Sequence, residues 1–261
     1  MQQIKPITKP ELRVAISRLK SRKAPGYDLI SPKILKELPE VGISFILYIF
    51  NAILRNVSFP IQWKTAQIKM ILKPGKPPDM ASSYRPISLL PILSKVLETL
   101  LLKRIQPIID EQKLIPDHQF GFRQKHSTIE QVNRVFTIAR RALEEKEYCT
   151  AAFVDITQAF DKVWHPGLLY KIRCIFPDNI YQIIQSYLTN RFFMVKVNNE
   201  MSHLYEIFSG VPQGSVLGPV LYLTFTFLSP QICTPPLLLM IPLSRLKACI
   251  QILHQTCFKK T

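Results

Sequence analysis

Hydrophobic residues recur at helical spacing through much of the first 146 residues. Residues 9–21 place Leu12, Ile16 and Leu19 on one helical face, and the segment 31–56 continues with the same spacing. The clearest amphipathic helix is predicted over 93–109, where five apolar side chains fall on one side: Val96, Leu97, Leu100, Leu101 and Ile105. The pattern predicts a mostly helical region joined by basic loops.

Strand patterns interrupt this region and then follow it. Residues 59–79 alternate apolar and basic side chains, which predicts an exposed strand pair leading into a basic loop. Further on, we expect a short buried strand over 149–156 and a hairpin over 192–208 that turns at Asn198 and Asn199.

Two helices are predicted among these later strands. Residues 165–175 form one that Pro166 opens, because proline suits the first helical turn. Residues 209–226 predict a tight turn and then a helix start capped by Ser215. Helices and strands together indicate an α+β protein.

Residues 227–261 follow none of these patterns. They contain no Asp, Glu, Gly or Tyr, hold three of the five cysteines and add four prolines at irregular spacing. A segment that packs into a fold keeps one apolar face, so we interpret this tail as one that was not selected as part of the fold.

The charge balance favours a polyanionic partner. The 34 Lys and Arg residues outweigh the 18 Asp and Glu residues, which gives a formal net charge of +16. This charge suits nucleic acid or an anionic membrane surface, and nucleic acid fits better because the basic residues recur along the chain with aromatic residues between them. The five cysteines lack the spacing of zinc ligands, so we expect reduced thiols in an intracellular protein.

The uncharged stretch 207–244 raises the alternative of a membrane span. A spanning helix requires about 20 consecutive apolar residues, and prolines divide this stretch into shorter pieces. They are Pro212, Pro219, Pro230, Pro235, Pro236 and Pro242. We therefore expect no membrane association, and the sequence identifies no protein partner.

Six motifs follow one another between residues 17 and 226. They read SRKAPGYDLISPKILKELP, WKTAQIKMILKPGK, SYRPISLLPILSKVLETLLLKRI, PDHQFGFRQKHSTIEQV, AAFVDITQAFDKVWHPGLLYKI and GVPQGSVLGPVLY. Together, and in this order, they resemble the reverse transcriptase domain of non-LTR (LINE-type) retrotransposons, most of all the jockey-like insect elements.

The resemblance implies a fold and an activity. The fold is an α+β right-hand polymerase, with fingers within residues 1–146, a partial palm over 147–226, an out-of-frame tail over 227–261 and no thumb. The activity is RNA-directed DNA synthesis, with an RNA template, a DNA primer and dNTPs as partners.

The resemblance also implies a metal site at Asp155, which ends an apolar run. In this family Asp155 and the carbonyl of Ile156 are Mg²⁺ ligands, and two Mg²⁺ ions clamp the attacking and leaving oxygens during nucleotidyl transfer. The alternative is that Asp155 only caps the following turn, which is a common use of Asp.

Further residues match the family's nucleotide site. Phe160 occupies the position of the aromatic gate that excludes a ribose 2′-hydroxyl, although a core phenylalanine would look the same. The spacing of Asp155 and Asp161 resembles that in viral RNA-copying polymerases, where a second Asp binds the 2′-hydroxyl. The GVPQGS and YRPISLL motifs nevertheless favour a reverse transcriptase. Gln213 and Gly214 match residues that line the nucleotide and template pocket, and the alternative is a plain tight turn.

Two cations match positions that contact the incoming triphosphate. They are Lys73 in LKPGK and Arg85 in YRPI, and phosphate oxygens favour such donors. The alternative for each residue is a solvated surface position without a role in binding. This alternative weighs more heavily against Lys73 than against Arg85.

The family's other metal ligands, an Asp pair in a Phe/Tyr-Ala-Asp-Asp hairpin, have no match, since no Asp follows Asp178. The tail contains Leu-Leu-Met-Ile-Pro at residues 238–242. The codons TTT GCT GAT GAT ACC for Phe-Ala-Asp-Asp-Thr give these five residues when read from the second base. We therefore hypothesise a frameshift between roughly Tyr222 and Leu237; the alternative is a diverged tail with an accidental match.

Three functions remain open. The first is a reverse transcriptase domain that is inactive as written, because its Asp pair is missing. The second is a non-catalytic RNA- and DNA-binding remnant of a mobile element. The third is a group II intron maturase or another polymerase relative.

Overall fold

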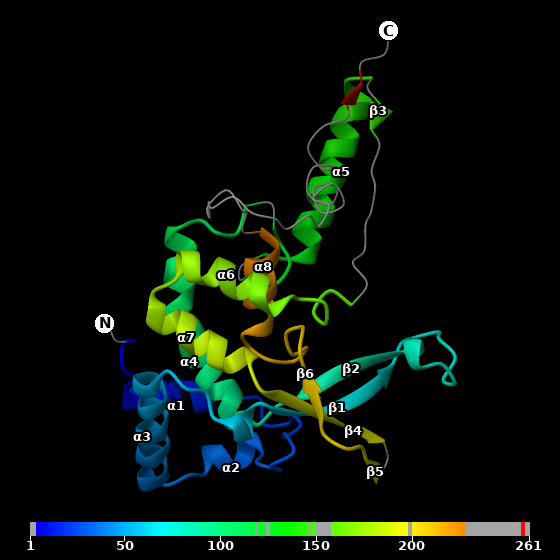
Figure 1. Cartoon of the computed structure of the whole chain (residues 1–261). Coiled ribbons are helices and arrows are strands. Elements are labelled where there is room, and N and C mark those ends of the chain that lie inside the picture. The colour runs from blue at the N-terminus through cyan, green and yellow to red at the C-terminus, as the bar shows by residue number, and fades with distance from the viewer. Residues whose placement is uncertain are drawn as a thin grey trace. The chain divides into compact units, whose positions relative to one another are not determined.

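The computed structural model describes residues 4–117, 119–123, 126–146, 148–149, 158–197, 200–227 and 257–258. The chain divides into two units (Figure 1). Unit 1 comprises residues 1–115 and 159–233, and unit 2 comprises residues 116–158 and 234–261. Helices and a five-stranded sheet together confirm the mixed helix and strand content expected from the sequence.

The first part of unit 1 is helical, as predicted. A capping box starts the first helix, because Thr8 accepts from the backbone of Glu11 and the Glu11 side chain bonds back to Thr8. The segment 31–56, where helical spacing was expected, forms two helices, and Pro39 is the N-cap residue of the second. The bounds are α1 Lys9–Ser17, α2 Pro32–Lys36, α3 Glu40–Asn56 and α4 Ile92–Glu111.

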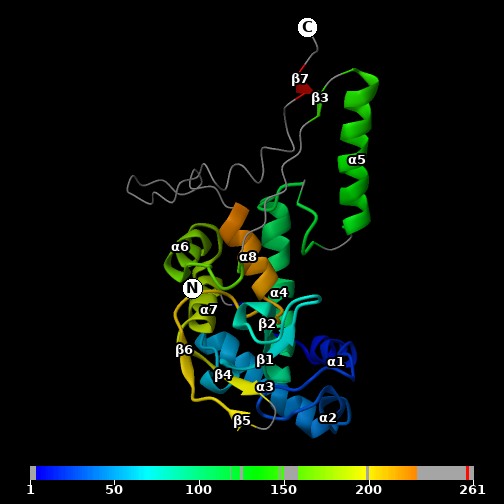
Figure 2. The ribbon, with the colours of Figure 1, turned by 90° about the vertical axis from the view of Figure 1, so that its right-hand side faces the viewer.

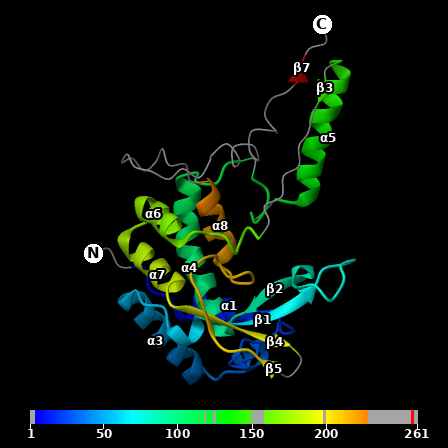
Figure 3. The ribbon, with the colours of Figure 1, turned by 45° about the vertical axis from the view of Figure 1, so that its right-hand side comes forward.

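Helix α4 is the amphipathic helix expected over 93–109. All five of its predicted core side chains are buried: Val96, Leu97, Leu100, Leu101 and Ile105. They join a hydrophobic core that α1, α3 and three later helices also supply, namely α6 (His165–Ile175), α7 (Asp178–Leu188) and α8 (Gly218–Phe227). Full burial of a side chain such as Leu97 contributes about 1.5–3 kcal/mol. Figures 2 and 3 both show α8 alongside α4.

The sheet of unit 1 corrects one expectation. Residues 59–79 supply a single strand, β1 (Thr65–Leu72), where the alternation predicted an exposed pair. The strand order is β2 (Tyr84–Leu89), β1, β4 (Arg191–Val197) and β5 (Glu200–Met201), so β1 has a partner on both sides and its alternate residues Ala66 and Ile68 are buried. Its antiparallel partner β2 follows the basic loop, and its parallel partner β4 comes over 100 residues later.

The hairpin expected over 192–208 is confirmed. Strand β4 pairs antiparallel with β5 (Glu200–Met201), with Val197 opposite Glu200. The chain then returns as β6 (Tyr205–Ile207), which pairs with the start of β4. The predicted turn residues 198–199 lie outside the described residues.

Three helices complete unit 1. Helix α6 (His165–Ile175) has the predicted bounds, with Pro166 in its first turn. Helix α7 (Asp178–Leu188) had not been singled out from the sequence. Helix α8 (Gly218–Phe227) follows the predicted tight turn. The Ser215 hydroxyl accepts a hydrogen bond from the Gly218 amide at 2.9 Å, which confirms it as the cap.

Unit 2 contains helix α5 (Thr128–Glu144). The helix begins with a capping box formed by Ser127 and Glu130. Strand β3 (Tyr148–Cys149) pairs antiparallel with β7 (Cys257–Phe258). The buried strand expected over 149–156 lies outside the described residues apart from Cys149. Within the part of the chain that the structure describes, no helix is long and apolar enough to cross a membrane.

Candidate functional site

The predicted site residues fall into two groups. Asp155 and Ile156, the expected metal ligands, lie outside the described residues. Lys73, Arg85, Phe160, Gln213 and Gly214 are all described and all belong to unit 1.

The turn at Gln213 and Gly214 is fixed against the edge of strand β2. The Ser88 amide donates to the Gln213 carbonyl oxygen at 2.9 Å. Gly214 has a φ of +119°, and a Cβ added there would lie 2.8 Å from the Ser88 carbonyl oxygen. Ser215 closes the turn by donating to the Pro212 carbonyl oxygen at 2.9 Å. The sequence motif is thus a tight turn and is also packed against the strand that contains Arg85.

This contact makes Gly214 sensitive to substitution. We expect Gly214→Ala to lower the free energy of unfolding by about 2–4 kcal/mol, because it combines a backbone strain of about 1–3 kcal/mol with a clash against Ser88. Gly75→Ala is a matched control, since Gly75 also has a positive φ, +71°, but its added Cβ would meet nothing within 4 Å. Urea unfolding measures both. Equal losses in the two variants would show that the contact with Ser88 contributes nothing.

The same turn is tied to the segment that contains Phe160. The Val211 amide donates to the Phe160 carbonyl oxygen at 2.8 Å, and the Gly210 amide donates to the Val163 carbonyl oxygen at 2.7 Å. His165 Nε2 hydrogen-bonds the Gly210 carbonyl oxygen at 2.7 Å. Burial lowers the pKa of His165, which favours the neutral ring there. Two motifs separated by about 50 residues are therefore joined by backbone hydrogen bonds.

Phe160 packs against helix α8. Its ring stacks on that of Tyr222, with centroids 5.0 Å apart and planes at 22°. Phe160 is half-buried and packs against the hydrophobic core. This placement is compatible with both the gate and the core interpretation.

The structure places the two predicted triphosphate cations differently. Lys73 Nζ donates to the Ser82 carbonyl oxygen at 2.8 Å, and the Lys73 amide donates to the Ser83 carbonyl oxygen, also at 2.8 Å. Lys73 thus closes the loop between β1 and β2. Arg85 is exposed on β2, three residues before Ser88, and no ion pair to it is found among the described residues.

One important residue of this region was missed from the sequence. Glu98 of α4 is fully buried, and its carboxylate accepts from the amides of Val216 and Leu217 at 2.7 and 3.1 Å. The Ser94 hydroxyl donates to it at 2.8 Å. Glu98 therefore caps the start of α8 and holds the end of the turn in place. The signal in the sequence was a single acid beside Leu97 on the apolar side of the predicted helix.

A buried arginine accompanies Glu98. Arg191 is 0% exposed, lies over the Tyr187 ring at 4.6 Å and donates from Nη1 to the Tyr187 carbonyl oxygen at 2.9 Å. Burial raises the pKa of Glu98, while the Ser94 and Leu217 hydrogen bonds and the charge of Arg191 act in the opposite direction. The core beneath the turn is thus polar and charged.

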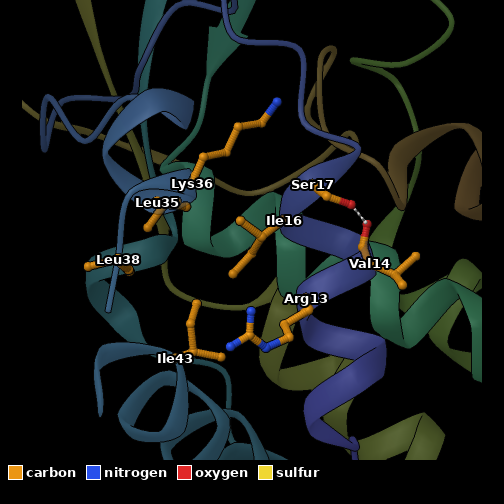
Figure 4. Close-up of a pocket in the computed structure, with 8 residues that line it drawn as sticks. All are labelled: Arg13, Val14, Ile16, Ser17, Leu35, Lys36, Leu38 and Ile43. Atoms are coloured by element: carbon orange, nitrogen blue, oxygen red, sulfur yellow. Dashed lines mark hydrogen bonds between the residues drawn. The ribbon is translucent and has the colours of Figure 1, made fainter. Parts of the chain in front are cut away.

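A cavity elsewhere in unit 1 does not contain any of the predicted site residues. It has a volume of about 510 Å³ and lies between α1, α2 and the start of α3 (Figure 4). Its lining is mainly apolar, its polar residues are Arg13, Ser17 and Lys36, and the Arg13 side chain extends toward Ile43. Arg13 is already paired with Glu40, and Lys36 Nζ donates to Ser21 at 3.3 Å. The cavity is therefore separate from the site that the motifs predict.

Among the described residues, the acidic side chains do not form a complete two-metal site. No group of three or more His, Cys, Asp or Glu side chains suited to a metal occurs among the described residues. Asp155 is the only matched carboxylate of the family's set, and no Asp follows Asp178 in the sequence. Two closely spaced Mg²⁺ ions need more carboxylate oxygens than this.

Comparisons with known proteins agree with the motifs. The sequence profile of the family described as "Reverse transcriptase (RNA-dependent DNA polymerase)" matches residues 71–230. The "Probable RNA-directed DNA polymerase from transposon BS" of Drosophila melanogaster is 51% identical over 223 residues, which are 85% of this chain and 25% of that protein. The "RNA-directed DNA polymerase from mobile element jockey" of the same species is 48% identical over 219 residues, 84% of this chain and 24% of that protein. The chain thus spans about a quarter of the length of the curated relatives it matches.

Proposed function

This chain belongs to the reverse transcriptase (RNA-dependent DNA polymerase) family, and on that premise we propose that it supplies the fingers and part of the palm of an RNA-directed DNA polymerase from a jockey-like non-LTR mobile element. The fingers would lie within residues 1–146 and the partial palm within 147–226. The observation that best supports this is the GVPQGS segment, in which Gln213 bonds to Ser88 while Gly210 and Val211 bond to the segment that begins at Phe160.

The proposed substrates are an RNA template, a DNA primer and dNTPs. Arg85, exposed on β2 beside the turn, is proposed to contact the triphosphate, and Phe160 is proposed to exclude a 2′-hydroxyl. Gln213 and Gly214 would shape the nucleotide and template pocket. Lys73 would act mainly through the loop that it closes, because its ammonium group already donates to Ser82.

Asp155 and the carbonyl of Ile156 are the proposed Mg²⁺ ligands. In an intact family site two Mg²⁺ ions supply the charge that activates the primer hydroxyl and stabilises the leaving oxygen. This chain supplies only part of the ligand set. We therefore propose that it is inactive as written and that a frameshift has put the Asp pair out of frame. The end of the family match at residue 230 supports this proposal, because most of the tail lies beyond it.

A second candidate function is a non-catalytic nucleic-acid-binding remnant, which the missing Asp pair and the net charge of +16 favour. Both candidates require binding to nucleic acid, and they differ in whether restoring the frame restores catalysis. A maturase-type relative is less well supported, since the compared proteins come from Drosophila mobile elements.

We expect the chain to bind an RNA–DNA hybrid with an affinity that falls steeply with salt. Each phosphate that a Lys or Arg neutralises releases counterions, so a protein with six to ten such contacts loses about 10³- to 10⁵-fold in affinity between about 50 and 200 mM salt. Fluorescence anisotropy at several salt concentrations measures this slope. Sucrose at matched osmolarity is the control and leaves the affinity unchanged. Salt-independent binding, or none, contradicts the proposed function.

A further inference from the structure

Two lysines lie opposite each other in the sheet of unit 1. Strand β1 pairs in parallel with β4, and the register places Lys69 directly opposite Lys196. Paired residues of adjacent strands project from the same face, and their strands are about 4.8 Å apart. Lys69 and Lys196, called here the lysine pair, therefore present two positive charges side by side on one face of the sheet. β1 is flanked by β2 and β4 in this sheet (Figure 3).

Among the described residues, no acid forms an ion pair with either member of the lysine pair. Both side chains are exposed. On the same face, Glu206 lies opposite Phe192, which is four residues along β4 from Lys196 and so about 13 Å away. Like charges directly opposite each other destabilise a sheet, so this arrangement costs stability and calls for an anionic partner.

The face with the lysine pair leads to the turn of the candidate site. Ile87 of β2 is the residue opposite Lys69 on the other side of β1 and shares its face. Ile87 Cγ2 lies 3.8 Å from the position of a Cβ on Gly214. Arg85, opposite Ile71, projects from the same face two residues away. A strand of nucleic acid that leaves the Gly214 turn across the sheet would pass Ile87, Lys69 and then Lys196.

We infer that the lysine pair binds the phosphate backbone of a nucleic-acid strand that crosses this face of the sheet next to the Gly214 turn. The inference rests on the proposed function, because it names the surface that extends that site. The lysines supply position and charge and do not read sequence, since phosphate contacts are the same for every base.

The test compares variants with equal changes in charge. Lys69→Gln/Lys196→Gln removes the pair, and Lys33→Gln/Lys103→Gln removes two exposed lysines from α2 and α4. The probe is an RNA–DNA hybrid with a single-stranded RNA extension. At about 0.1 M salt we expect the first variant to bind about 10- to 60-fold more weakly and to lose about 1.8 from the salt slope, as two phosphate contacts require. The control should stay within about twofold of the unaltered chain.

Two further measurements make the outcome decisive. Lys69→Arg/Lys196→Arg should retain binding, because arginine also neutralises phosphate. The melting temperature of the Gln variant should equal or exceed that of the unaltered chain, because a like-charge contact is relieved. If the unaltered chain binds the hybrid and the Gln pair binds as well as the control, the inference is wrong and the proposed function stands. If the unaltered chain does not bind at all, both fail.

Discussion

The chain as given is expected to leave a primed RNA template unextended, whereas a frame-restored version extends it. The physical reason is the ligand set of the metal site. The proposed ligands, Asp155 and the carbonyl oxygen of Ile156, carry too little negative charge to hold two Mg²⁺ ions about 3.5–4 Å apart, and the proposed in-line displacement depends on that clamp. The measurement is Mg²⁺-dependent dNTP incorporation, with the frame-restored version extended past the restored Asp pair through the thumb that the resemblance implies.

Two variants separate the charge of the missing acids from their context. Met240→Asp/Ile241→Asp puts carboxylates into the tail as written, and we expect no recovery, because a site misplaced by about 1 Å can already lose about 10²-fold in rate. Asp155→Ala in the frame-restored version should abolish incorporation. Steady incorporation by the chain as given would mean that the carboxylates come from elsewhere and would contradict the frameshift hypothesis.

The elements that could be predicted from the sequence are those whose pattern is local. The helix at 165–175 and the amphipathic helix within 93–109 were found because spacing and capping signals lie within each segment. Helix α7 shows the same spacing in its buried residues and could have been found in the same way. The pairing of β1 with β4 could not, because it joins strands far apart in the chain and its register depends on tertiary packing.

The candidate site could also be predicted only in part: its local motifs could be identified from the sequence, but the contacts between distant segments could not. The motifs identified Phe160, Gln213 and Gly214, but not the hydrogen bonds that join them to each other and to Ser88, since those depend on how the segments fold together. Glu98 was missed because an acid on the apolar side of a helix breaks the hydrophobic pattern. Such a break is itself a signal of a buried, bonded carboxylate.

Glu98→Ala is expected to lower the free energy of unfolding by about 3–5 kcal/mol. The change leaves the amides of Val216 and Leu217 and the hydroxyl of Ser94 without their acceptor in a buried site. Each buried donor left unsatisfied costs about 1–3 kcal/mol, so the loss of three bonds to one carboxylate has a cost of this size. Urea unfolding measures it. Glu111→Ala is the matched control, an exposed acid at the end of the same helix, and should change stability by less than about 0.5 kcal/mol.

Glu98→Gln tests the charge separately from the shape. The amide can still accept from the α8 backbone, so we expect a smaller loss, about 1–2 kcal/mol.

Burial raises the pKa of Glu98 above its ordinary 4.5, so between that value and the raised pKa the folded state binds more protons than the unfolded state. The contribution of Glu98 is therefore complete below pH 4.5 and is lost as the pH rises through its folded pKa. His165, whose pKa burial lowers, changes stability in the opposite direction but equally in both proteins. The stability difference between the unaltered chain and Glu98→Gln should thus shrink as the pH rises from 4.5. If the stability difference between the two proteins stays constant with pH, folding does not change the pKa of Glu98. The carboxylate would then act on α8 through its hydrogen bonds alone.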